Sequence, residues 1–89
     1  MKVIKFGAVW CPGCLVMRPL WEKLEAENPW LETEYFDFDK DKEAVTEFGI
    51  DSKLPVFIFQ DKLGAEIVRL QGERSKSELL DLINKHKEA

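Results

Sequence analysis

The sequence predicts an α/β protein in which a mixed four-stranded sheet is flanked by helices, with the elements in the order β-α-β-α-β-β-α. A strand, a helix and a second strand follow one another over residues 2–38, and such a unit forms a parallel pair with a right-handed crossover. Two β-rich runs at 56–59 and 66–70 then form a hairpin, which adds two antiparallel strands. The 89 residues, of which 45% are hydrophobic, are expected to form one domain, residues 1–89, around a single core.

The first strand and the first helix are predicted from residues 2–9 and from Pro12 onward. Residues 2–9 are β-rich, and after them apolar residues recur at three- and four-residue steps. The expected buried stripe is Leu15, Met17, Leu20, Trp21 and Leu24, and the expected solvent-facing residues are Glu22, Lys23, Glu25 and Glu27. Pro12 suits the first helical position, Pro19 should kink the helix, and Asn28-Pro29 ends it.

Residues 31–38 alternate in polarity and predict the second strand, with Tyr35 and Phe36 on opposite faces. Asp39 or Asp41 can cap a short helix, which Gly49 ends in a left-handed conformation.

The second half of the chain opens at Leu54-Pro55, directly before the strand at 56–59. A proline that enters a strand after a loop is often preceded by a cis bond, and we predict one here. Gly64 divides the hairpin. Ser75 and Glu78 form a capping-box pair ahead of a closing helix.

Composition and charge exclude several classes of protein. Thirteen Lys and Arg against 17 Asp and Glu give a formal net charge of −4, which disfavours nucleic acid and anionic membranes as partners. No apolar run approaches the roughly 20 residues of a membrane span, and Lys5 interrupts any signal-peptide core. A cytosolic location is therefore expected.

Cys11 and Cys14 are the only cysteines and lie three positions apart. We predict a redox dithiol, since so short a disulfide loop would stabilise the fold little. A metal or cluster shared between two chains, or an inert pair, remains an alternative. Within one chain His86 is the only histidine, and it is more simply a solvated side chain.

The predicted position of the pair favours thiol chemistry. Cys11 falls at or near the helix N-cap, where unpaired N–H groups and the helix dipole stabilise a thiolate nucleophile. Cys14 lies one turn further in and is expected to be more buried and to resolve the mixed disulfide. Trp10 would shield the thiol and form a docking surface, and Lys5 is a candidate for favouring the thiolate.

In chain order, the sequence contains a strand, Trp10-Cys11-Pro12-Gly13-Cys14, a helix with Pro19, Leu54-Pro55 before a strand, and Gly72 before the last helix. Together these features resemble the thioredoxin family over essentially the whole chain. The resemblance implies a thioredoxin-like fold, an attacking Cys11 and a resolving Cys14. It also implies a cis-Pro55 facing the disulfide, and a substrate surface that includes Trp10, Leu54 and Gly72. Pro12 and Gly13 would support the site.

The chain also departs from that pattern. It lacks the additional N-terminal strand and helix, and Lys5 and Tyr35 stand where thioredoxins usually carry a buried aspartate and its lysine partner. Proline as the first residue between the cysteines is more typical of glutaredoxins, but the glutathione-binding motifs of that family are absent.

The sequence therefore predicts a thiol-disulfide oxidoreductase that reduces protein disulfides, is recharged by a thioredoxin-reductase-type donor, and acts as a monomer. It would need no metal or cofactor beyond the Cys11–Cys14 pair. A glutathione-linked activity is the alternative.

Overall fold

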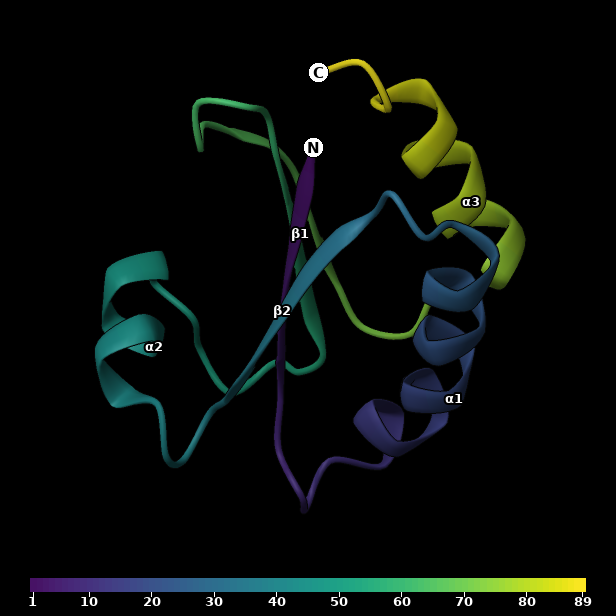
Figure 1. The fold of residues 1–89 in the computed structure, drawn as a ribbon. Coiled ribbons are helices and arrows are strands. Elements are labelled where there is room, and N and C mark those ends of the chain that lie inside the picture. The colour runs from purple at the N-terminus through teal and green to yellow at the C-terminus, as the bar shows by residue number, and fades with distance from the viewer.

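A computed structural model describes residues 1–89 and has the predicted order of elements (Figure 1). The strands are β1 (Lys2–Gly7), β2 (Glu32–Asp37), β3 (Val56–Gln60) and β4 (Glu66–Gln71), and the helices are α1 (Pro12–Glu27), α2 (Lys42–Phe48) and α3 (Lys76–Lys85). The predicted elements are all present. The first strand ends at Gly7, two residues before the predicted boundary, because its partner β2 ends at the paired residue Asp37.

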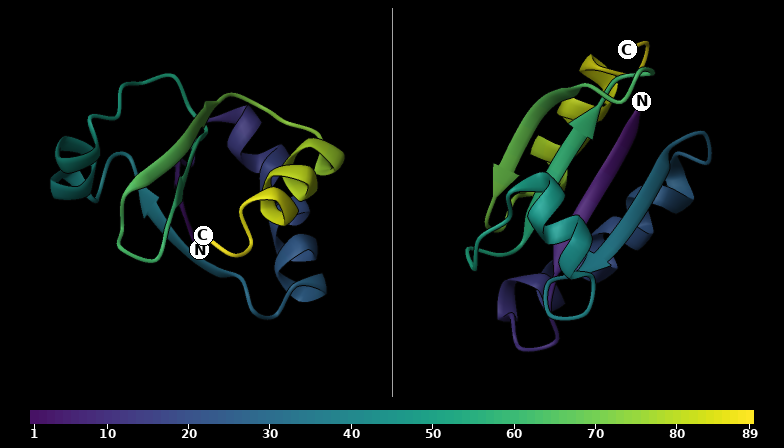
Figure 2. Two further views of the ribbon diagram at one scale, coloured as in Figure 1. Left: turned by 90° about the horizontal axis from the view of Figure 1, so that it is seen from above. Right: turned by 90° about the vertical axis from the view of Figure 1, so that its left-hand side faces the viewer.

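The sheet has the strand order β2-β1-β3-β4, so that β1 and β3 are central and β2 and β4 form the edges. β1 pairs with β2 in parallel and with β3 antiparallel, and β3 pairs antiparallel with β4. The predicted mixed four-stranded sheet is thereby confirmed. Viewed along the sheet in Figure 2, α1 and α3 lie on one side of it and α2 lies on the other.

Two groups of buried side chains hold these layers together. Alternate residues of the central strands point to opposite faces of the sheet. Val3, Phe57 and Phe59 pack with Trp21 and Leu24 of α1 on one face. The other face is covered by the second group, which comprises Ile4, Phe6, Ile50, Val56 and Ile58.

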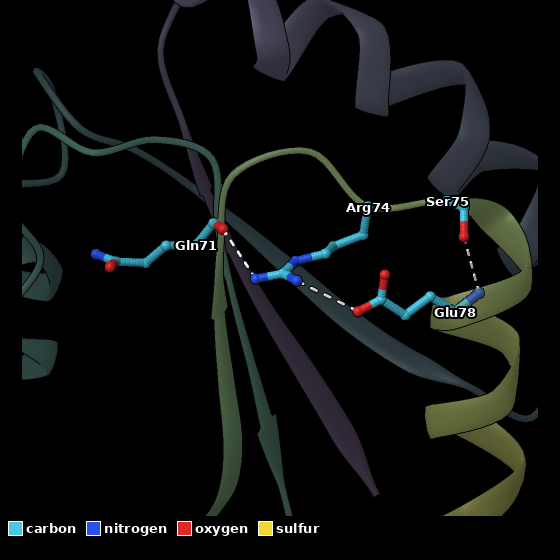
Figure 3. A network of polar contacts seen from close by, with 4 residues as sticks. All are labelled: Gln71, Arg74, Ser75 and Glu78. Atoms are coloured by element: carbon cyan, nitrogen blue, oxygen red, sulfur yellow. Dashed lines mark hydrogen bonds and ion pairs between the residues drawn. The ribbon is translucent and has the colours of Figure 1, made fainter.

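The N-terminus of α3 only partly matches the predicted capping box. The Ser75 hydroxyl accepts a hydrogen bond from the Glu78 N–H at 3.1 Å, as predicted for an N-cap. The Glu78 carboxylate, however, accepts at 3.3 Å from the Arg74 guanidinium, which also donates to the Gln71 carbonyl at 3.1 Å (Figure 3). Arg74 thus joins the end of β4 to the start of α3.

No helix is long and apolar enough to cross a membrane.

Candidate active site

Cys11 lies at the N-cap of α1, at the C-terminal end of the central strand β1. Its backbone is extended (φ −93°, ψ 110°), and its N–H donates to the Ala8 carbonyl at 3.2 Å, which turns the chain into the helix. The Cys11 sulfur accepts a hydrogen bond from the Cys14 N–H at 3.2 Å. This is the geometry in which helix N–H groups and the helix dipole stabilise a thiolate.

Cys14 lies on the first turn of α1. Both cysteines are free thiols. Burial, followed by the hydrogen bond with Cys11, raises the pKa of the Cys14 thiol from 9.0 to about 12. Cys14 therefore keeps its proton at neutral pH. The two cysteines consequently occupy chemically different environments although they are one helical turn apart.

The relative burial of the two cysteines is the reverse of the prediction. Cys11 is only 4% exposed, whereas Cys14 is partly exposed and lines a cleft. Cys11 lies where the chain folds back on Ala8, next to a first helical turn against which Pro55 packs. Cys11 therefore presents little accessible surface to a partner.

The raised pKa of Cys14 predicts selective labelling of the reduced protein. At pH 7.5 iodoacetamide should modify Cys11 only, and Cys14 should react only at strongly alkaline pH, because the thiolate is the nucleophile. Peptide mass spectrometry over a pH series checks this. Preferential labelling of Cys14 near neutral pH would contradict the assignment.

Residues far apart in the sequence meet beside the cysteine pair. The Leu54-Pro55 peptide bond is cis, as predicted. A Cβ placed on Gly13 would lie 3.1 Å from Pro55 Cδ and 3.3 Å from Glu73 Cγ. Gly72, in the positive-φ region at 90°, donates its N–H to the Pro55 carbonyl at 2.8 Å.

A side chain at Gly13 or Gly72 would therefore disturb this assembly, through crowding at Gly13 and backbone strain at Gly72. Leu54, predicted to belong to the substrate surface, is half-buried beside Pro55, and Pro12, predicted to support the site, occupies the first helical position.

Trp10 lies on the surface next to Cys11. Its side chain is 51% exposed, and its indole N–H donates to Asp39 at 2.7 Å. Its ring meets Phe38 edge-on, with the ring centroids 6.2 Å apart. Asp39, considered from the sequence only as a helix cap, instead holds Trp10 in place. Asp41 occupies the N-cap position of α2, but its side chain does not cap the helix as predicted, because its carboxylate accepts a hydrogen bond from the Asp37 N–H at 2.7 Å.

Lys5 has a partner that the sequence did not reveal. Its ammonium lies 2.6 Å from the Glu25 carboxylate and 5.5 Å from the centre of the Trp21 ring. The prediction that Glu25 faces away from the sheet is therefore wrong, because α1 turns this side chain toward β1. Glu25 lies 11 residues beyond Cys14 on α1, which is roughly 16 Å along the helix axis at the usual rise per residue. The ion pair with Glu25 therefore directs the Lys5 ammonium toward the C-terminal end of α1.

Two further sequence expectations concern α1 and the C-terminus. Leu15 is 55% exposed instead of buried, and Val16 beside it is equally exposed. His86 is the C-cap of α3, with its N–H bonded to the Leu82 carbonyl.

The structure contains no group of three or more histidine, cysteine or carboxylate side chains that could hold a metal ion.

The fold and the Cys-x-x-Cys pair at a helix N-terminus define the class of thioredoxin-like thiol-disulfide oxidoreductases. The family model described as "Thioredoxin" matches residues 1–85. The chain belongs to the thioredoxin family and is a thiol-disulfide oxidoreductase.

Individual relatives agree with this assignment. A thioredoxin of Chlamydia muridarum is 33% identical over 86 residues, which are 97% of this chain and 82% of that protein. Among solved structures, thioredoxin-2 of a malaria parasite is 28% identical and has a TM-score of 0.87, with 96% of this chain and 82% of that chain covered. Fasciola hepatica thioredoxin is 32% identical, with a TM-score of 0.85 and coverage of 96% and 79%.

Proposed function

We propose that this protein reduces disulfides in other proteins in the cytosol, with Cys11 as the attacking thiol and Cys14 as the resolving thiol. The observation that carries this proposal is the asymmetry of the pair. The Cys11 sulfur accepts a hydrogen bond from the Cys14 N–H at the helix N-terminus, an arrangement that favours a thiolate, while the pKa of Cys14 is raised to about 12, so that this thiol stays protonated.

The proposed reaction has two exchange steps. The Cys11 thiolate attacks one sulfur of the substrate disulfide, forms a mixed disulfide and releases the other sulfur as a thiol after protonation. Cys14 then attacks the Cys11 sulfur, closes the Cys11–Cys14 disulfide and releases the second substrate sulfur, which takes up the proton lost by Cys14. The substrate gains two electrons from the cysteine pair, and no further cofactor takes part.

The surface around Cys11 supports a protein as the substrate. Val9, Trp10, Leu15 and Val16 are all more than half exposed and lie next to the cysteines in the sequence. Such a group of exposed apolar side chains is typical of a surface that contacts partners. We propose that this surface, with Leu54, Pro55 and Gly72, receives an extended segment of the substrate.

The electron donor and the reduction potential test this function. We expect a thioredoxin reductase with NADPH to sustain insulin reduction by the monomeric protein, and glutathione alone to sustain little. The potential of the Cys11–Cys14 couple should lie near that of reducing family members, about −270 mV, which redox titration measures. A potential near the roughly −120 mV of a strong oxidant, or glutathione as the better donor, would overturn the proposal.

A further inference from the structure

Gly7 brings a tyrosine hydroxyl close to the Cys14 thiol. A Cβ at Gly7 would lie 2.9 Å from the Tyr35 Oη and 3.2 Å from the Cys14 Sγ, which is closer than side-chain atoms normally approach. The hydroxyl and the sulfur therefore both border the space that a side chain at residue 7 would fill. A side chain at residue 7 would crowd both atoms, and glycine leaves this space free.

The register of the sheet explains how Tyr35 reaches this place. Tyr35 on the edge strand β2 is paired with Lys5 on β1, and Gly7 follows Lys5 on the same face of β1. Tyr35, Gly7 and Cys14 all line one cleft of about 300 Å³ between the sheet and α1. The ring is half exposed, while its hydroxyl end extends over Gly7 toward the helix.

We propose that the Tyr35 hydroxyl donates a hydrogen bond to the Cys14 sulfur as that thiol becomes a thiolate, and thereby speeds resolution of the mixed disulfide. This inference rests on the proposed function, in which Cys14 is the resolving thiol. The hydrogen bond stabilises the charged form of Cys14. The Cys14 proton still ends on the departing substrate sulfur, and Tyr35 itself gains and loses no proton overall.

The protonation of Tyr35 agrees with a donor role. Burial, with the charges of Asp37 and Cys14, raises the pKa of the Tyr35 phenol, and Arg18 partly opposes this increase. The phenol therefore keeps its proton throughout the neutral range. The charged and titratable groups that face the cleft beside Tyr35 are Lys5, Cys14, Arg18, Glu22 and Glu25, and Lys5 is held by Glu25.

Tyr35→Phe tests the proposal, because it removes the hydroxyl and keeps the ring. The reduced protein is mixed with 5,5′-dithiobis(2-nitrobenzoate), which releases one thionitrobenzoate when Cys11 attacks and a second when Cys14 resolves the mixed disulfide. In Tyr35→Phe the first phase should be unchanged. The second should slow about tenfold, as expected for the loss of a hydrogen bond to a charged group, and its rise with pH should move to higher pH.

Thr33→Val is the matched control, because it removes a hydroxyl from the same face of β2, two residues before Tyr35 and opposite Val3. Its two phases should equal those of the unaltered protein. An unchanged second phase in Tyr35→Phe, or a slower one with the same pH dependence, would overturn the role of the hydroxyl. Loss of the first phase in Cys14→Ser, together with a first phase of normal rate in Cys11→Ser, would instead overturn the proposed function, because Cys14 would then be the attacking thiol; the two failures can thus be distinguished.

Discussion

Replacing Cys11 with serine is expected to abolish disulfide reduction, and replacing Cys14 with serine is expected to trap the substrate as a mixed disulfide. A serine hydroxyl at the α1 N-cap can still accept a hydrogen bond from the residue 14 N–H, so Cys11→Ser should keep the fold and lose only the nucleophile. In Cys14→Ser the first exchange proceeds, but no thiolate follows to release the substrate.

Insulin turnover and non-reducing gels measure the two outcomes. Cys11→Ser should show no turnover above the uncatalysed rate, and Cys14→Ser should give a covalent adduct that dithiothreitol releases. Circular dichroism of both variants should match that of the unaltered protein. Full turnover in either variant would show that the two cysteines do not work as a pair.

Phe59→Ala is expected to destabilise the fold by about 3–5 kcal/mol, the usual cost of removing a buried aromatic side chain and leaving a cavity. Phe59 lies on the central strand β3, is 0% exposed, and has its ring centroid 6.5 Å from that of Trp21. The packing of α1 against the sheet therefore depends on this ring. Urea unfolding followed by tryptophan fluorescence gives the free energy of unfolding.

Leu63→Ala is the control for that measurement. Leu63 is 94% exposed in the hairpin loop, so its truncation should change the free energy of unfolding by no more than about 0.5 kcal/mol. An equally small change in Phe59→Ala would show that the core does not depend on this ring.

The order of the elements could be predicted because it rests on local signals. The β-rich runs, the apolar periodicity after Pro12 and the loop at Gly64 each depend on a few neighbouring residues, and the resulting elements occur in the structure. The N-cap position of Cys11 and the cis bond before Pro55 followed from the same kind of signal.

The contacts that failed prediction join residues distant in sequence. Periodicity placed Glu25 on the solvent face, but it cannot show that Lys5, 20 residues earlier, reaches across from β1. The same holds for Trp10 and Asp39, which are 29 residues apart. Leu15 matches an apolar stripe, yet it lies near the start of α1 and is 55% exposed, which the periodicity of the helix alone does not show.

The relative burial of the cysteines was missed for a similar reason. Local sequence placed Cys11 at the start of a helix, where a side chain is usually accessible. The fold-back onto Ala8 and the packing of Pro55 on the first turn depend on segments that the motif does not contain.

The two outer strands also determine how copies of the molecule behave toward one another. The unpaired backbone of an edge strand can join the sheet of a neighbour, which is the usual first step of aggregation. Here β2 carries Glu32 and Glu34, and β4 begins at Glu66 with an irregular pairing near Gln60. Antiparallel joining of two β2 strands would bring like charges together, so the edges that complete the active-site sheet also discourage its extension.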